Sequence, residues 1–600
     1  MHPVDLLRHP TVPQDESPAK FAAAAPGVSI QSRCEPSSAD FGSGCESKRR
    51  HQAIDEDMAD RNHPPARRSG LISRSAHLVV AALVTSVCLF HGLTSFGLVG
   101  PDEPRYAAVA RDMAEGNDWV TPRLHGEPWL EKPILYYWVA AVGYRLFGDT
   151  EVAARLPSVA GAATTMLALS WLTRRFYGAP TAGLFLLLFP SSIAILVFAR
   201  AATTDMLFTA TLSLSMVTAA PLVIARDSRG MTGWQIGFGT ALGLAVLAKG
   251  PAGIVLAGAS ILIGALASGR LRQVLRLAGP WSLVSFALVA LPWYVLCALR
   301  NPEFIQVFFI SHNVERFLTP VFQHQQAFWY FGPVLLFGLA PWTAAIGATI
   351  HRVATTLRRR DWTGSPSMFL AGWVLFPVVF FSLSQSKLPG YVLPAIPAAT
   401  VLLARALALA LNRPAAARTV GLGTAGVLSA MAIAFFAAPG VASAGVPTGA
   451  VRPLALILTV AAVATGYLGG RGRLRAAVTV AALTIGLGLW QLNTTLMPQL
   501  DAGLSTRVAA QEARSLAGGE AVHTYGLHRG WQYGLEYYLH GALPEWTSDT
   551  PAGSLVVTNS RGMRTMQLEG AGIVVLREVS PDAMVVRTDP DGERLTPAQD

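Results

Sequence analysis

Charged side chains are scarce in this sequence of 600 residues. They make up 14% of it, whereas soluble globular domains carry about 25%. Only four cysteines occur, and none has the spacing of a zinc motif, a redox motif or a disulfide framework. The sequence also lacks the short polar–apolar alternation of porin strands and a glycine-rich phosphate loop of recognisable type. These absences argue against a soluble domain, a disulfide scaffold and a membrane β-barrel, and they give no sign of a nucleotide site.

Long apolar runs fill most of the chain instead. Hydrophobic residues make up 52% of the sequence, and the runs are near the length of about 20 residues that a helix needs to cross a bilayer. The sequence therefore predicts an α-helical polytopic membrane protein with about 13 transmembrane helices. The predicted spans are 77–99, 153–172, 180–199, 204–225, 233–248, 250–267, 277–299, 329–350, 367–385, 391–411, 418–438, 452–469 and 474–492.

Arginines occupy every second loop between these spans, as at Arg174 and Arg175, or Arg471 and Arg473. By the positive-inside rule these loops and the N-terminus are cytoplasmic, and the alternate loops are external. The net charge of +10 lies in the membrane part, because residues 1–75 hold ten basic and ten acidic residues. We therefore expect membrane topology and membrane lipids, not nucleic acid, to explain the positive charge.

Composition divides the chain into three parts. Residues 1–75 are rich in proline, serine, alanine and charge, which predicts a disordered cytoplasmic tail. Residues 76–492 form the predicted transmembrane domain, with 100–152 as the first external loop. Residues 493–600 alternate short apolar runs ("SLVVTN", "GIVVLRE", "AMVVRT") with glycine and proline turns, which predicts a small external α/β domain.

The first external loop carries an unusual set of charges. "DEPRYAAVARDMAEG" predicts a short surface helix with Asp102 and Glu103 at its start and Gly116 at its end. "EKP" then brings Glu131 and Lys132 against the aromatic "ILYYW". Two alternatives remain open: the first two acids only cap the helix, and Lys132 only anchors the chain at the interface. The second alternative leaves Glu131 unexplained.

Further charges recur at the outer ends of later spans. Asp205 in "ARAATTDMLF" is an acid near the end of a membrane helix, which is rare without a role or a partner such as Arg200. Lys249 in "LAKGPAG" is either functional or a plain turn lysine. Lys387 and Tyr391 begin a span in "SQSKLPGYVLPAIPA", where prolines are tolerated if the backbone lines a cavity.

The external loop 300–328 adds His312, Glu315 and Arg316 in "ISHNVERFL", although a lone histidine is more often structural than a metal ligand. Acids and cations thus gather on one side of the membrane from separate loops. Arginine and lysine suit a lipid phosphate, and carboxylates beside them suit an acceptor group or a metal.

These motifs together resemble the lipid A aminoarabinose transferases. That family belongs to the polyprenyl-phosphate-sugar-dependent membrane glycosyltransferases, which include the protein O-mannosyltransferases. The resemblance covers roughly residues 77–410 and rests on "DEPRYA", "EKPILYYW", "ARLPS", "TTDM", "AKGPAG" and "SKLPGYVLPAIPA". It implies a GT-C fold and an enzyme of the bacterial inner membrane with a periplasmic active site. The donor would be undecaprenyl phosphate carrying a sugar, best matched by 4-amino-4-deoxy-L-arabinose, and the acceptor lipid A or a related envelope glycan.

The resemblance also implies residue roles. The catalytic acids would be Asp102 and Asp205, with Glu103 beside them. The groups expected to hold the carrier phosphate are Arg105, Lys132, Lys387, Tyr391, Arg316 and Lys249. A divalent metal such as zinc would be held by Glu131 and His312, with His523 or His528 from the C-terminal domain. No nucleotide cofactor is expected.

Three matters stay open at this point. The transfer is expected to be an inverting displacement, but the sugar could also be galacturonic acid or a hexose. The acceptor could be a protein hydroxyl or another glycan. A transporter or flippase of polyprenyl-linked sugars is the alternative from another class; it would place polar residues near the bilayer midplane, often with inverted repeats, whereas these charges lie at one interface.

Overall fold

The computed structural model describes residues 69–224, 230–315, 326–360, 362–441 and 448–589. Side chains at 69–74, 311–315, 438–441, 448 and 450 are outside this description. The chain divides into two units, Met1–Gly70 and Leu71–Asp600, and nearly all described residues belong to the second. The predicted disordered tail therefore lies outside the described residues and stays a prediction.

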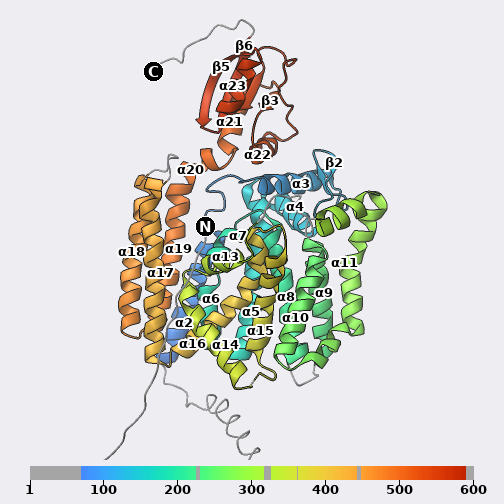
Figure 1. The fold of residues 1–600 in the computed structure, drawn as a ribbon. Helices are drawn as coiled ribbons and strands as arrows, with labels where there is room; N and C mark the ends of the chain where they lie inside the picture. The colour runs from blue at the N-terminus through green and yellow to red at the C-terminus, as the bar shows by residue number, and fades with distance from the viewer. Residues whose placement is uncertain (1–68, 225–229, 316–325, 361, 442–447, 590–600) are drawn as a thin grey trace, which may run out of the picture. The chain divides into compact units, whose positions relative to one another are not determined.

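Long apolar helices dominate the second unit (Figure 1). Among the described residues, nine spans are long and apolar enough to cross a membrane, and a bent pair makes up to ten. The nine are α5 (Glu151–Tyr177), α8 (Thr204–Ile224), α9 (Met231–Lys249), α11 (Pro280–Arg300), α15 (Pro366–Leu383), η5 with α16 (Pro389–Ala395 and Ile396–Ala410), most of α17 (Pro414–Val441), most of α18 (Thr448–Gly470), and α19 with η6 and α20 (Leu474–Gln491, Leu492–Leu496 and Met497–Leu504).

Shorter helices complete the helical region. Three are apolar: α2 with η1 (Ser69–Thr85 and Ser86–Phe90), α6 (Ala179–Leu188) and α10 (Ala252–Ala267). The others are α7 (Ile193–Phe198), η2 (Leu271–Ala278), η3 (Ile305–Glu315), α13 (Phe331–Gly338), η4 (Trp342–Ala345) and α14 (Ile346–Arg358). The predicted helical membrane protein is confirmed, while the number of 13 transmembrane helices stays a prediction.

Two predicted spans are interrupted. The predicted span 180–199 is split into α6 and α7 around Pro190, and the predicted span 329–350 bends by 109° between α13 and η4, next to Pro341. Proline has no N–H to donate and clashes with the preceding turn, so a continuous helix ends there. Periodicity alone does not reveal these breaks.

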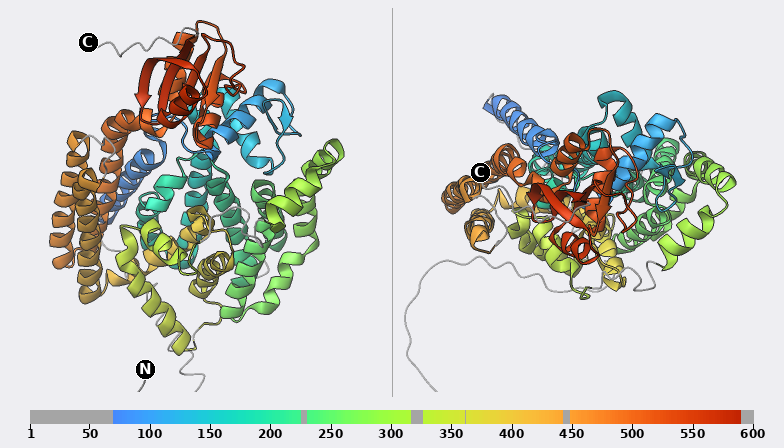
Figure 2. Two further views of the ribbon diagram at one scale, coloured as in Figure 1. Left: turned by 45° about the horizontal axis from the view of Figure 1, so that its top comes forward. Right: turned by 90° about the horizontal axis from the view of Figure 1, so that it is seen from above.

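Helix α8 lies at the centre of the helical region, because 89% of its most apolar stretch is buried. It packs between α5 and α9. Helices α17, α18 and α19 run side by side (Figures 1 and 2). The first two approach closely at Gly421 and Gly469: a Cβ on Gly421 would lie 2.6 Å from the Cα of Gly469. Small residues at such a crossing let two membrane helices come into van der Waals contact.

The predicted first external loop is itself folded. It contains α3 (Asp102–Gly116), a short antiparallel hairpin of β1 (Arg123–Leu124) and β2 (Glu127–Pro128), and α4 (Leu135–Phe147). The predicted helix 102–116 is confirmed, and Asn117 ends it in a left-handed conformation. Helix α4 was not anticipated, because its apolar stretch is too short to read as a span.

The C-terminal part is a small α/β unit, as predicted. Its sheet has the order β3 (Val522–Tyr525), β4 (Leu555–Thr558), β6 (Ala583–Asp589) and β5 (Gly572–Ser580). The β3–β4 pair is parallel and the others are antiparallel. Helices α21 (Arg507–Ala517), α22 (Arg529–Leu539) and α23 (Ser560–Leu568) accompany the sheet. The predicted boundary at residue 493 falls inside η6, since the helical chain continues to Leu504.

Candidate active site

Arg105 lies at the centre of a cluster on the first turns of α3. Its guanidinium is 2.6 Å from Asp102 Oδ1 and 3.9 Å from Glu131 Oε2, and its side chain is only 7% exposed, against 51% for Asp102. Burial by itself lowers the pKa of Arg105, but the carboxylates of Asp102 and Glu131 outweigh burial and raise this pKa above its usual value. Arg105 is therefore a fixed, buried positive charge beside an accessible carboxylate.

Three aromatic rings surround this guanidinium. The carbon Cζ of Arg105 lies 4.9 Å from the ring centre of Trp129, 5.3 Å from that of Tyr106 and 5.5 Å from that of Tyr533. Such distances are within the range of cation–π attraction. Trp129 comes from the segment before α4, and Tyr533 comes from α22 in the C-terminal unit. Residues far apart in sequence thus confine one cation.

Tyr106 interacts with carboxylates from three segments of the chain: Asp102, Glu131 and Asp205. Burial raises its pKa most, the charges of Asp102, Asp205 and Glu131 raise it further, and only Arg105 opposes them. The phenol of Tyr106 therefore stays protonated and can donate a hydrogen bond. These electrostatic interactions bring Asp205, from the start of α8, into the same neighbourhood as α3.

Asp205 forms an ion pair with Lys249, the last residue of α9. Their side chains are 22% and 24% exposed, so the pair is partly accessible. The alternative partner Arg200 is wrong, because its guanidinium donates to the carbonyls of His91 and Gly92 instead. Lys249 is therefore more than a turn lysine: it holds the acid in place.

Residues of η5 lie next to the ion pair of Asp205 and Lys249. The ammonium of Lys249 lies 5.7 Å from the ring centre of Tyr391, and the ring of Tyr391 packs on Phe381 at 4.9 Å. A Cβ on Gly390 would lie 3.0 Å from Asp205 Oδ2. Lys387 is buried, and its ammonium donates to the carbonyl of Ser384 at 2.6 Å, inside its own loop.

Glu103 has a different environment from its neighbour Asp102. It is buried, and its carboxylate accepts from the backbone N–H groups of Val99 at 3.0 Å and Ala202 at 2.8 Å. Arg155 pairs with it at 3.1 Å. A carboxylate with all these donors is not available to a substrate, so this geometry favours a structural role over the expected catalytic one.

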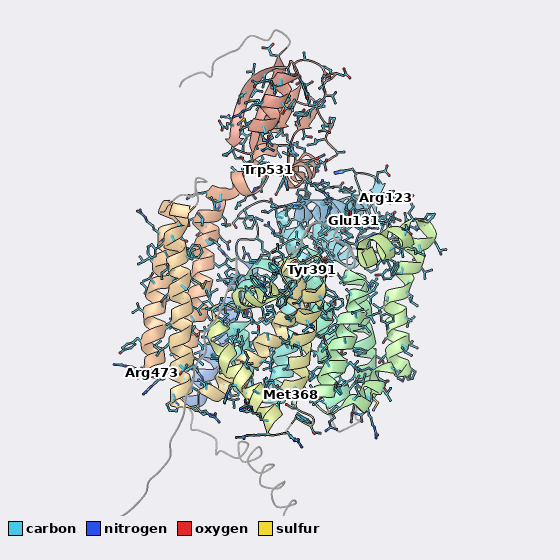
Figure 3. All side chains as sticks on the ribbon, viewed as in Figure 1. Arg123, Glu131, Met368, Tyr391, Arg473 and Trp531 are labelled. Carbon is cyan, nitrogen blue, oxygen red and sulfur yellow. The ribbon has the colours of Figure 1, made fainter. Side chains whose placement is uncertain are left out.

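Glu131 and Lys132 lie in the segment that leads into α4, and both are partly buried. Figure 3 shows Glu131 and Tyr391 in the half of the helical region nearer α3, and Met368 and Arg473 at the far end of the helices. The candidate residues from four segments therefore meet at one end of the helical region.

The residues predicted to hold a metal lie in different environments. Glu131 faces Arg105, and His528 Nδ1 accepts from the N–H of Gly530 at 3.2 Å as the cap of α22. His523 lies in β3, His312 lies in η3 with its side chain outside the described part, and Arg316 is outside it altogether. Within the described ranges, no group of three or more His, Cys, Asp or Glu side chains is placed to hold a metal. Because the side chain of His312 is outside the described part, the metal site stays a prediction, and no step below passes through a metal.

Sequence reasoning missed Tyr106, Trp129 and Tyr533. Lysine is scarce in the chain, and three of its five lysines, Lys132, Lys249 and Lys387, are residues that the sequence predicted for the site. The aromatic partners carried no comparable signal, because tyrosine and tryptophan are common at membrane interfaces.

The helical architecture and this site define the class: a polytopic membrane protein with a GT-C fold. The structure is similar to ArnT from Cupriavidus metallidurans bound to undecaprenyl phosphate, with a TM-score of 0.71 and 24% identity, over 88% of this chain and 100% of that one. This likeness shows the fold.

Sequence comparisons find similar proteins. A family model described as dolichyl-phosphate-mannose-protein mannosyltransferase matches residues 131–296. The chain is 31% identical over 309 residues to the undecaprenyl phosphate-alpha-4-amino-4-deoxy-L-arabinose arabinosyl transferase of Edwardsiella ictaluri (strain 93-146), over 51% of this chain and 54% of that protein. It is 33% identical over 349 residues to the protein of the same name from Pseudomonas aeruginosa (strain LESB58), over 58% and 62%.

The chain is thus similar over about half of its length to arabinosyl transferases of this name, and its fold is that of the solved ArnT. The matches confirm the resemblance that the loop motifs indicated. The chain spans about half the length of the first curated relatives it matches.

Proposed function

We propose that this protein is a glycosyltransferase that moves 4-amino-4-deoxy-L-arabinose from undecaprenyl phosphate to lipid A. Relatives named as arabinosyl transferases of this donor support the proposal, as does the similar ArnT bound to undecaprenyl phosphate. We further propose that it lies in the bacterial inner membrane, with a cytoplasmic N-terminus and its site facing the periplasm. The arginine-rich loops, including the one with Arg473 at the far end in Figure 3, support this orientation.

One observation carries the proposal. Two cations, Arg105 and Lys249, each face a carboxylate, Asp102 and Asp205. Both carboxylates interact electrostatically with Tyr106. A lipid-linked sugar phosphate presents a phosphate, a sugar and an apolar tail. Fixed cations suit the phosphate, partly accessible carboxylates suit the sugar, and the membrane receives the tail.

Charge neutralisation is the main contribution expected from the cations. In an inverting displacement, the bond between the anomeric carbon and the phosphate oxygen breaks, and its electron pair leaves with the phosphate. The acceptor oxygen forms its bond on the opposite face. The leaving phosphate gains negative charge, so a cation already fixed and desolvated stabilises the transition state more than the ground state. Arg105 meets this requirement.

The carboxylates have two uses that depend on the acceptor. If the acceptor is a sugar hydroxyl, Asp205 or Asp102 takes its proton as the new bond forms. If it is an anionic phosphate, no base is needed, and a carboxylate instead orients the ammonium group of the aminosugar. Asp102 is half exposed and suits that contact.

Mass spectrometry of lipid A tests the proposal. Cells lacking the protein are complemented with the wild type or with Asp102→Asn. We expect the wild type to restore a mass increment of one aminoarabinose and Asp102→Asn to lower it at least about tenfold, by analogy with loss of an acid–base group. The matched control is Asp549→Asn, an exposed aspartate of the C-terminal unit, which should behave as wild type. Identical lipid A with and without the wild-type protein contradicts the proposed acceptor.

A protein acceptor is the second candidate, because the mannosyltransferase family model covers 131–296. In that case lipid A is unchanged by deletion, and a periplasmic glycoprotein loses a sugar mass instead.

A further inference from the structure

The aromatic cage of Arg105 includes one ring from outside the membrane domain. The rings of Tyr106 and Trp129 come from α3 and the segment before α4, whereas the ring of Tyr533 comes from α22. The Nε atom of Arg105 is buried and has no hydrogen-bond partner in the part of the chain that the structure describes. In the described part of the chain, two carboxylates and three rings contact this guanidinium.

Helix α22 is held firmly against α3 and α4, so Tyr533 has a fixed position. One turn after Tyr533, the hydroxyl of Tyr537 donates to Asp149 at 3.0 Å and lies 3.0 Å from that of Tyr144. Arg111 of α3 donates to the carbonyl of Tyr537 at 2.9 Å. Residues four apart share a helix face, so this docking directs Tyr533 toward α3 as well.

The ring of Tyr533 also contacts a second cation, Arg529. Arg529, one turn before Tyr533, lies 5.3 Å from its ring centre and donates to its hydroxyl at 3.3 Å. The ring therefore touches two guanidinium groups, one exposed and one buried. Arg529 restrains the ring through its hydroxyl, and the ring restrains Arg105 through its face.

We propose that Tyr533 is a positioning residue that fixes Arg105 for the donor phosphate, which makes the C-terminal unit a part of the active site. This inference rests on the proposed function. Without the ring, the guanidinium loses one of its three aromatic contacts and can move from its place beside Asp102 and Glu131. The donor phosphate then meets a misplaced cation.

Kinetics with the purified full-length protein test this inference. Tyr533→Leu removes the ring at similar volume, and we expect the KM for the lipid-linked donor to rise about fivefold, in line with one partly buried cation–π contact. Tyr533→Phe keeps the ring and should recover most of that loss. Mere loss of folded enzyme would lower kcat at unchanged KM. The matched control is Tyr525→Leu, a tyrosine of the same unit that packs on Trp546 instead.

A binding measurement separates the two proposals. Thermal-shift titration with undecaprenyl phosphate in detergent should show a similar loss of affinity in Tyr533→Leu but not in Tyr525→Leu. If the wild type transfers no sugar yet this difference appears, the positioning role stands and the proposed reaction fails. If Tyr533→Leu matches the wild type in donor KM and in affinity, or if Tyr533→Phe is as impaired as Tyr533→Leu, the positioning role is overturned.

Discussion

At the scale of single residues, buried arginines shape the chain that leads into the site. Arg155 donates to the carbonyls of Phe96 at 3.1 Å and Gly97 at 2.8 Å, and also pairs with Glu103. Arg200 caps two carbonyls just before them. Buried carbonyls need donors, and arginine supplies several in a fixed fork. These arginines fix the segment that delivers Asp102 and Arg105.

Gly390 leaves room for the carboxylate of Asp205 because it has no side chain. Its replacement gives the first prediction. A Cβ there would lie 3.0 Å from both Asp205 Oδ2 and Phe198 Cε1. Because the ion pair with Lys249 holds Asp205, the carboxylate must shift by a few tenths of an ångström. We expect Gly390→Ala to lower kcat about tenfold, since misplacement of a reacting group by about 1 Å costs about a hundredfold.

The control is Gly332→Ala in α13, where an added Cβ has no heavy atom within 4 Å. That helix packs against η5 as well. Transfer assays on both variants should separate them, with only Gly390→Ala impaired. Equal activity in the two would show that Asp205 tolerates the shift.

Site residues differ in how far sequence could predict them. Asp102, Arg105, Asp205 and Lys249 belong to quoted motifs, and the structure brings them together, although their roles remain predictions. The partner of Asp205 could not be inferred, because Lys249 lies 44 positions away at the end of another helix. Tyr533 could not be inferred either, because its contact depends on how α22 docks on α3.

At the scale of elements, the contact of α22 with α3 borders an open polar pocket of about 270 Å³. Its lining comes from α3, the β1–β2 hairpin and the end of α22, and consists of Arg111, Asp112, Glu115, His125, His540, Gly541 and Ala542. Two histidines cross the contact: His125 lies 3.2 Å from Glu536, and His540 lies 3.2 Å from Asp149. The His540–Asp149 pair therefore makes this contact sensitive to pH.

His540 gives the second prediction. Burial lowers its pKa most and Arg111 lowers it further, and together with Arg514 they outweigh Asp149 and Glu115, which raise it. The unfolded chain has the ordinary histidine pKa of about 6.5 and so binds the proton more readily. Stability from this group is then complete above that pH and is lost as the pH falls below it. We expect a lower unfolding temperature at pH 5.5 than at pH 7.5.

His540→Asn isolates this contribution, because asparagine tolerates the positive φ of 64° at this position. The drop in unfolding temperature between the two pH values should be smaller in the variant than in the wild type. The same drop in both proteins would mean that other groups cause it.

At the scale of the whole molecule, composition predicts the class and leaves the path of the chain open. Apolar runs locate most helices, and glycine and proline turns locate β4, β5 and β6. Breaks beside Pro190 and Pro341 divide two runs that were predicted as single helices. Helix α4 was not predicted because it has only 13 residues. It packs within a folded loop, so it does not need the length of a membrane span.

Removal of residues 1–68 gives the last prediction. Every candidate site residue lies between Asp102 and Tyr533, and the first 68 residues hold no apolar run long enough to cross a membrane. We expect a chain beginning at Ser69 to reach the membrane and to modify lipid A at the wild-type level, measured by mass spectrometry and immunoblotting. A chain beginning at His91 is the control. It lacks α2 and η1, whose Ala81, Val84 and Cys88 lie in the main core, so it should not accumulate. A chain from Ser69 that accumulates normally but leaves lipid A unmodified would give the N-terminal residues a part in the reaction.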